Sequence, residues 1–148
     1  MSLQFVPVEP RHFARITAIE SRAHQFPWKP SMLQNLEGRG AFNFALLLND
    51  EVIGYFYAQN IVGEVTLLNI AIDPVYQGKG YGEQLMCYFL NCCEQQKAES
   101  VWLEVRESNL AAYTLYLKFD FHDVDRRVGY YPASQGREDA LIMSYFFS

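Results

Sequence analysis

The sequence has 148 residues, of which half are hydrophobic, and a formal net charge of −5. This length favours one domain over residues 1–148, and the acidic balance disfavours a nucleic-acid partner while favouring a cationic substrate. We find no apolar run long enough for a membrane helix and no signal-peptide pattern in residues 1–5, so we expect a cytoplasmic protein without a membrane partner.

The cysteines and histidines give no sign of a metal site. Cys87, Cys92 and Cys93 are odd in number and lack C-x-x-C spacing, which argues against disulfides and zinc and fits a reducing cytoplasm. All three fall in one helical segment, where we expect core packing. The three histidines are scattered without metal or triad spacing, so we expect surface or packing roles for them.

In the first half of the chain, apolar residues recur at helical spacing within residues 11–22. Ser31 can cap a short helix that carries Met32 and Leu36. Four apolar runs predict strands, and the turn Asn49-Asp50 joins the second and third of them into a hairpin. These predicted strands are residues 5–8, 42–48, 52–58 and 65–72.

In the second half, a helix is predicted to begin near Tyr81, with four apolar residues on one face: Leu85, Phe89, Cys92 and Cys93. A strand at residues 101–105 turns Val101, Leu103 and Val105 to one side, and Trp102, Glu104 and Arg106 to the other. A short helix over residues 109–117 and closing strands at 121–124 and 140–146 follow. The order predicts a mixed α/β sheet with helices on both faces.

The segment Gln77-Gly78-Lys79-Gly80-Tyr81-Gly82 separates the strand at 65–72 from the helix that follows. Three of the five residues from Gly78 to Gly82 are glycines without a Cβ, so backbone N–H groups of this strand-to-helix turn can converge on an anion such as a pyrophosphate. The spacing is neither that of a P-loop nor that of a dinucleotide loop. The alternating pattern is Gln-x-x-Gly-x-Gly.

Several motifs occur together with this loop. They are Arg22-Ala23-His24, Phe26-Pro27-Trp28, Phe42-Asn43-Phe44, Asn69-Ile70-Ala71-Ile72-Asp73-Pro74, Trp102-Leu103-Glu104-Val105-Arg106, Ser108-Asn109, Leu115-Tyr116, Tyr130-Tyr131-Pro132 and Gly136-Arg137-Glu138-Asp139. On these residues, nearly end to end, the chain resembles the GCN5-related N-acetyltransferases (GNAT), most closely the RimI type. The resemblance implies the GNAT fold, a mostly antiparallel mixed sheet, and acetylation of the N-terminal alanine of a small-subunit ribosomal protein.

The resemblance also implies acetyl-CoA as cosubstrate, with no metal. Backbone groups of the glycine loop would bind its pyrophosphate, and the preceding strand would hold the acetyl carbonyl and the pantetheine arm through an oxyanion hole. A bulge in that strand would splay it from the next strand and open a slot for the thioester. The implied cofactor-binding residues are Ile70, Ala71, Ile72, Gly78, Lys79, Gly80, Tyr81, Gly82, Glu83 and Asn109.

Two side chains match the catalytic positions of the family. Glu104 would accept the proton of the attacking amine, directly or through a water. Tyr116 would donate a proton to the departing thiolate. Tyr130 and Tyr131 are candidates for the walls of the alanine slot. Candidate anionic contacts for a basic peptide are Glu20, Glu37, Glu64, Glu138 and Asp139.

Two positions depart from the family pattern. Glu83 replaces an expected basic residue near the phosphates, and Asp120 replaces a glycine, so it must adopt a left-handed turn. Two alternatives stay open at this point. One is an acetyltransferase of the same chemistry that acts on another protein N-terminus or a small amine; the other is an acyl-CoA-binding module without catalysis.

Overall fold

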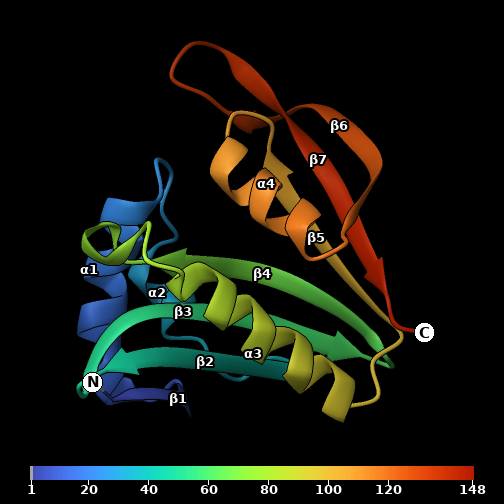
Figure 1. Cartoon of the computed structure of the whole chain (residues 1–148). Helices are drawn as coiled ribbons and strands as arrows, with labels where there is room; N and C mark the ends of the chain where they lie inside the picture. The colour runs from blue at the N-terminus through green and yellow to red at the C-terminus, as the bar shows by residue number, and fades with distance from the viewer. Residues whose placement is uncertain (1) are drawn as a thin grey trace.

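The computed structural model describes residues 2–148, and one seven-stranded sheet runs through it in the order β1-β2-β3-β4-β5-β7-β6 (Figure 1). Every neighbouring pair is antiparallel except β4 and β5, which are parallel. The strands are β1 (Leu3–Pro7), β2 (Ala41–Leu48), β3 (Glu51–Ile61), β4 (Glu64–Ile72), β5 (Ser100–Arg106), β6 (His122–Pro132) and β7 (Arg137–Phe146). The predicted mixed, mostly antiparallel α/β sheet is confirmed.

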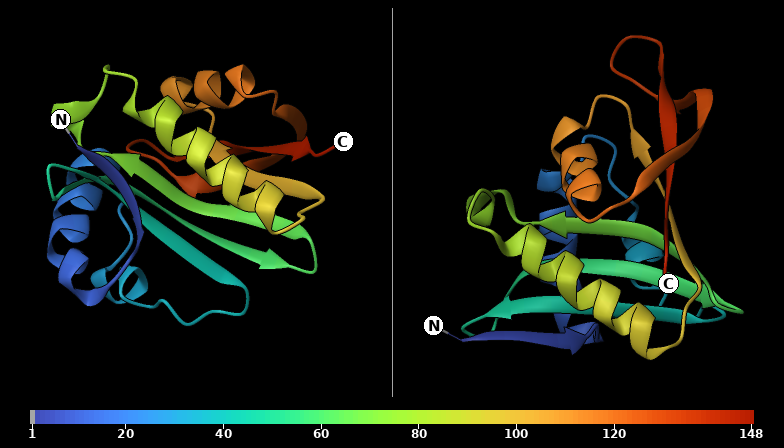
Figure 2. Two further views of the ribbon diagram at one scale, coloured as in Figure 1. Left: turned by 60° about the horizontal axis from the view of Figure 1, so that its bottom comes forward. Right: turned by 45° about the vertical axis from the view of Figure 1, so that its right-hand side comes forward.

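Helices cover both faces of this sheet, as predicted (Figure 2). Ile16, Ile19 and Leu33 pack with one set of strand residues, and a separate apolar cluster joins Leu85 and Phe89 to the opposite face. The α-helices are α1 (Phe13–Ala23), α2 (Pro30–Leu33), α3 (Tyr81–Gln95) and α4 (Leu110–Lys118), and short 3₁₀ turns lie at Pro10–His12 and Pro74–Tyr76.

Three local predictions are wrong. Ser31 does not cap α2, because Pro30 occupies the first turn and Lys29 is the cap residue; α2 also ends before Leu36. Cys87 is exposed rather than packed in the core, whereas Cys93 is buried. The first closing strand is not residues 121–124, because β6 runs on to Pro132. Its side chains are mostly exposed and four of the eleven are Asp or Arg, so no alternation of apolar residues predicted the full strand.

Asp120 does adopt a left-handed conformation, with a φ of 69°. Its N–H donates to the carbonyl of Leu117 at 3.0 Å, which closes the turn after α4. Asp tolerates this conformation better than most residues do, so the departure from glycine leaves the end of α4 intact. The position of Tyr116 on α4 is therefore unaffected.

A bulge in β4 positions the site. Tyr57 pairs with Asn69 and Ala58 with Leu67, so Leu68 is an extra residue without a partner in β3. β4 pairs with β5 only at its beginning, from Glu64 to Thr66. After the bulge the two parallel strands separate, in agreement with the splay that the family resemblance implied.

Candidate active site

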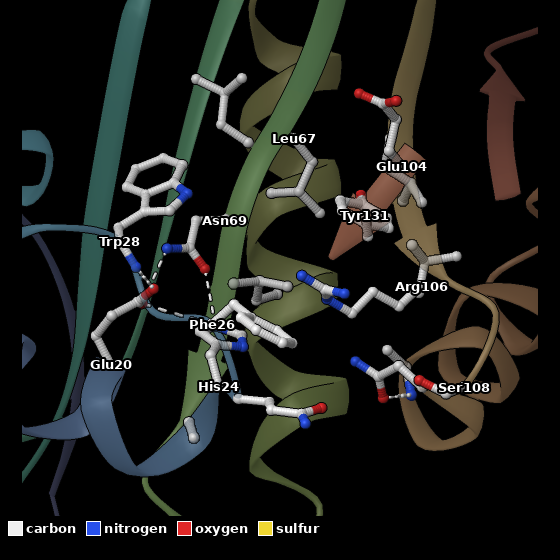
Figure 3. A pocket seen from close by; sticks show the side chains of 18 of the residues that line it. Glu20, His24, Phe26, Trp28, Leu67, Asn69, Glu104, Arg106, Ser108 and Tyr131 are labelled. Carbon is white, nitrogen blue, oxygen red and sulfur yellow. Dashed lines mark hydrogen bonds and ion pairs between the residues drawn. The ribbon is translucent and has the colours of Figure 1, made fainter. Parts of the chain in front are cut away.

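A cavity of about 420 Å³ lies where β4 and β5 separate. Its walls come from the segment between α1 and α2, from β4, β5 and the start of α4, and from Tyr131 in β6. Figure 3 shows side chains from these elements turned toward one another. Both predicted catalytic residues, Glu104 and Tyr116, line this cavity.

Glu104 lies on β5 between Leu103 and Val105, whose side chains are buried in the core. Strand alternation therefore turns its carboxylate to the other face, as predicted. The Nε of Arg127, in β6, lies 3.3 Å from its Oε2. A substrate ammonium that approaches Glu104 thus meets a carboxylate already paired with a partly exposed guanidinium, and it must share or replace that partner.

Tyr116 is only 5% exposed, on the inner side of α4. Within residues 2–148 its hydroxyl has no hydrogen-bond partner, yet it is not among the fully enclosed unpartnered atoms, so it is open to the cavity. Burial, and to a lesser extent Tyr131, raises the pKa of Tyr116 well above the usual range. The side chain therefore holds its proton at neutral pH and can donate it.

The β4 edge beside the cavity offers backbone N–H groups. The N–H of Asp73 donates to Ile53 in β3 at 2.7 Å, and N–H groups alternate between the two edges of a strand. Ala71 therefore faces β3, whereas Ile70 and Ile72 face the edge that β5 has left. The Nε2 of Gln77 donates to the Ile72 carbonyl at 3.0 Å from that side. Of the three residues predicted to form an oxyanion hole, Ile70 and Ile72 therefore have N–H groups on the open edge of β4, and Ala71 does not.

The glycine loop follows β4 directly and ends at α3. Gly78 and Gly80 have φ values of 76° and 87°, and Gly80 is the cap residue of α3. A Cβ at either position would meet nothing within 4 Å, so backbone conformation, not space, requires glycine there. Free N–H groups at the start of a 15-residue helix suit an anion. No neighbour within the described chain fills the space beside these two residues.

Two polar side chains of this region are held by neighbouring elements. Glu83, in the first turn of α3, forms an ion pair with Lys118 of α4, which offsets its negative charge next to the loop. The Oδ1 of Asn109 accepts a hydrogen bond from the Ala112 N–H at 3.2 Å, so Asn109 caps α4 as predicted. Its Nδ2 remains available to a ligand, since it donates to no group within residues 2–148.

No pattern in the sequence indicated a buried polar cluster around Glu20, in the part of the cavity wall that α1 and the segment after it form. Glu20 is 1% exposed, and its carboxylate accepts hydrogen bonds from the Tyr55 hydroxyl at 2.6 Å, the Asn69 amide at 2.9 Å and the Trp28 N–H at 2.8 Å. The Nε2 of His24 lies 3.0 Å from the Asn69 Oδ1. Glu20 therefore anchors the segment after α1 to the sheet, and its carboxylate is already engaged by three donors.

The other candidate anionic contacts lie on three different parts of the chain. Glu138 pairs with Arg106 at 3.0 Å, and Asp139 pairs with Arg126 at 2.6 Å, so both carboxylates brace the β6–β7 hairpin. Glu64 begins β4, and Glu37 lies beyond α2. Neither of them lines the cavity.

A wide irregularity in β6 places the two predicted wall tyrosines. Arg127 pairs with Ala140 but Tyr131 pairs with Glu138, so three residues of β6 lie opposite one of β7. The Asp139 Oδ1 accepts a hydrogen bond from the Gly129 N–H at 2.8 Å, which holds this irregularity. Of the two tyrosines only Tyr131 lines the cavity, where burial and nearby Glu104 raise its pKa to about 12.

Among the described residues there is no group of three or more His, Cys, Asp or Glu side chains that could hold a metal ion. The same part of the chain contains no helix that is long and apolar enough to cross a membrane.

Comparison with known proteins agrees with this geometry. The model of the acetyltransferase (GNAT) family matches residues 13–121. The [ribosomal protein bS18]-alanine N-acetyltransferase of Haemophilus influenzae is 41% identical over 140 residues, which cover 94% of this chain and 95% of that protein. Its counterpart from Escherichia coli K12 is 40% identical over 126 residues, or 85% of each chain.

Solved structures give the same result. The crystal structure of the ribosomal-protein-S18-alanine N-acetyltransferase from Escherichia coli superposes with a TM-score of 0.93 at 36% identity, and covers 99% of this chain and 95% of that one. Arabidopsis thaliana NAA60 shares the fold, with a TM-score of 0.88 at 19% identity. The chain therefore belongs to the acetyltransferase (GNAT) family, and within it to the group of the [ribosomal protein bS18]-alanine N-acetyltransferases.

Proposed function

We propose that this chain transfers the acetyl group of acetyl-CoA to the N-terminal alanine of ribosomal protein bS18 in the cytoplasm, as one catalytic domain. The observation that carries the proposal is that Glu104 and Tyr116 line one cavity at the β4–β5 splay. The carboxylate of Glu104 can accept the proton of the attacking amine, and the hydroxyl of Tyr116 can donate a proton to the departing thiolate. Relatives at about 40% identity named for this activity support the choice of substrate.

Acetyl-CoA fits the residues that are present. The pyrophosphate would take up the N–H groups of the loop from Gly78 to Gly82 and of the first turn of α3, with Lys79 adding charge. The pantetheine arm would lie along the free edge of β4, and the Asn109 amide is available beside it at the start of α4. Ile70 and Ile72 would then donate to the thioester oxygen as negative charge develops there.

The chemistry needs a neutral amine. A free α-amino group has a pKa of about 7.7–8.0, so roughly 10–25% is neutral near pH 7. Glu104 accepts the proton from the ammonium, directly or through a water, and the amine nitrogen then attacks the thioester carbonyl carbon. As the carbon–sulfur bond breaks, Tyr116 passes its proton to the sulfur. The attacking nitrogen loses two protons in all: the first passes from Glu104 to solvent, and the second, which is lost after the attack, restores the proton of Tyr116 through solvent. The products are therefore the N-acetylated chain, CoA with a thiol and one released proton.

The pairing of Glu104 with Arg127 has a consequence for this step. The Nε of Arg127 lies 3.3 Å from the Oε2 of Glu104. An arriving ammonium competes for the same oxygen atoms, so the ion pair limits how tightly a simple amine is held. A peptide gains further contacts along the walls, which favours a peptide N-terminus over a small free amine.

A substrate panel tests the proposed function. The panel contains peptides that begin Ala-Arg, the same peptides with Ser, Gly, Leu or Phe in first place, Ala-Arg peptides blocked at the α-amino group, and spermidine. Each would be incubated with acetyl-CoA and analysed by mass spectrometry. We expect acetylation at the α-amino group of the alanine peptide, weaker activity on Ser or Gly starts, and little on Leu or Phe starts. A preference for lysine side chains or spermidine would assign the chain to a different acetyltransferase activity. Absence of all turnover, with acetyl-CoA still bound, would indicate a binding module.

A further inference from the structure

Arg106 lies on β5 two residues after Glu104, on the same face of the strand. Its guanidinium carbon lies 4.4 Å from the centre of the Phe26 ring and 4.3 Å from the centre of the Tyr131 ring. In Figure 3 the guanidinium lies between these two labelled side chains. All three residues line the cavity. One side chain therefore contacts both the segment after α1 and the β6–β7 hairpin.

Neither ring is held by the apolar core of the described chain. Phe26 and Tyr131 are absent from both core clusters and from the apolar residues packed against them. Phe26 is 39% exposed and lies in the segment between α1 and α2. The ring of Tyr131 also lies against the ring of Tyr130, with ring centres 5.0 Å apart. Arg106 is therefore a contact that Phe26 and Tyr131 share and that lies outside the apolar core.

The same guanidinium of Arg106 is also hydrogen-bonded to the β6–β7 hairpin. Its Nη1 donates to the carbonyl of Pro132 at 2.6 Å and to the Glu138 carboxylate at 3.0 Å. The Ser108 hydroxyl donates to the same carboxylate oxygen at 3.1 Å, and together these bonds hold the pKa of Glu138 below its usual value. The guanidinium is therefore locked by two acceptors on the hairpin while it contacts the two rings.

We propose that Arg106 is a positioning residue that sets substrate specificity: it bridges Phe26 and Tyr131 across the cavity, so that an amine reaches Glu104 only from the end of a chain with a small first side chain. This inference rests on the proposed function. The bridge narrows the entrance between the two walls. A bulky first side chain would have to separate Arg106 from one ring, which costs cation–π contact on that side.

Lysine cannot replace arginine in this role. An ammonium retains the charge and can still pair with Glu138, but it lacks the flat, rigid fork that contacts two rings while it bonds two acceptors. We expect Arg106→Lys to raise KM for an Ala-Arg peptide about tenfold, since cation–π contact is lost. The value of kcat and the acetyl-CoA dissociation constant should stay within about threefold, because the proton-transfer groups remain. The ratio of kcat/KM for a peptide that begins with Ala to that for a peptide that begins with Leu should decrease.

Arg126→Lys is the matched control. Arg126 also contacts two carboxylates, at 2.7 Å and 2.6 Å, but it does not line the cavity. A second variant, Phe26→Leu, removes one ring at a partly exposed position that belongs to neither core cluster. We expect it to raise the peptide KM in the same direction. Combined with Arg106→Lys it should add little, since both changes break one bridge.

Steady-state kinetics on peptides with Ala, Ser, Val and Leu starts, with acetyl-CoA binding measured by calorimetry, decides the matter. The wild-type rate on the Ala peptide tests the proposed function alone, and the ratio of variant to wild type tests Arg106. The inference is overturned if Arg106→Lys leaves KM and the first-residue preference unchanged. It is also overturned if only kcat falls, or if Arg126→Lys gives the same change, which would indicate a general brace of the hairpin.

Discussion

The two sides of the cavity are built in different ways. On the glycine-loop side, which comprises β4, residues 77–82 and the start of α3, consecutive residues present backbone N–H groups. On the hairpin side, which comprises the segment after α1, Arg106 and the β6–β7 hairpin, side chains far apart in the sequence contact one another. Backbone recognition suits a ligand common to a whole family, whereas side-chain recognition can vary with the substrate.

Because the two sides are built differently, we expect substitutions on them to affect the binding of different ligands. A change on the glycine-loop side alters the geometry of main-chain donors and should affect acetyl-CoA. A change on the hairpin side alters the walls and should affect the peptide. Tyr116 lies on α4, where the two sides meet, and its loss should affect chemistry alone.

The largest effect is expected from Tyr116→Phe. The hydroxyl is open to the cavity and keeps its proton at neutral pH, so its removal leaves the thiolate without a donor. We expect kcat to fall ~10²–10⁴-fold with acetyl-CoA affinity unchanged, measured by steady-state kinetics and calorimetry. Tyr113→Phe is the control on the same helix, because its hydroxyl donates to Asp123 outside the cavity. Equal losses in the two variants would remove Tyr116 from the mechanism.

Gly80→Val should weaken acetyl-CoA binding without unfolding the protein. A β-branched residue is disfavoured at a φ of 87°, and forcing another conformation turns the loop N–H groups away. We expect the dissociation constant to rise at least tenfold by calorimetry, with the circular dichroism spectrum retained. Gly136→Val, at a φ of 74° in equally open space but far from the loop, is the control. Unchanged affinity in the Gly80 variant would separate the loop from the binding site.

Glu20→Gln should mainly reduce stability. The carboxylate accepts three hydrogen bonds, and a glutamine presents an NH₂ group to at least one of these donors. We expect about 1–3 kcal/mol lower free energy of unfolding, measured in urea, because a buried donor loses its acceptor. Glu94→Gln, at an exposed position of α3, should leave stability unchanged. A variant as stable as wild type would mean that the cluster does not hold the segment after α1.

The smallest effect is expected on the acid stability of the protein, through Asp139 in the β6–β7 hairpin. The Arg126 guanidinium and the Gly129 N–H hold the pKa of Asp139 below its usual value. A lowered folded-state pKa gives stability that is present above the unfolded value of about 3.9 and is lost as pH falls through the folded one. We expect the urea midpoint to fall less below pH 4 in Asp139→Asn than in wild type. Parallel pH curves for the two proteins would contradict this.

The sequence predicted the local features of the site better than the contacts between residues far apart in the chain, for a physical reason. Alternation in β5 gave the direction of Glu104, and the loop motif gave the start of α3, because both depend on neighbouring residues. The bulge at Leu68 has no signature in its own residues; it is visible only in the pairing with β3. The partners of Glu20 lie 35 and 49 positions away, so no local pattern could reveal that cluster.

The family resemblance supplied what periodicity could not, namely the splay, the acetyl-CoA site and the roles of the two catalytic candidates. It did not supply the bridge from Phe26 through Arg106 to Tyr131, although all three residues belong to motifs that matched. Three motifs distant in sequence meet at one point of the cavity, and only the fold brings them together.

The pH dependence of turnover by Glu104→Gln and Tyr116→Phe tests the assignment of acid and base most directly. Turnover of an Ala-Arg peptide would be measured for both variants between pH 6 and 9, a range chosen to span an α-amino pKa of about 7.7–8.0. We expect Glu104→Gln to recover as the amine loses its proton to solvent, whereas Tyr116→Phe stays slow throughout. Parallel profiles, or near wild-type rates in both variants with normal acetyl-CoA binding, would contradict the assigned mechanism.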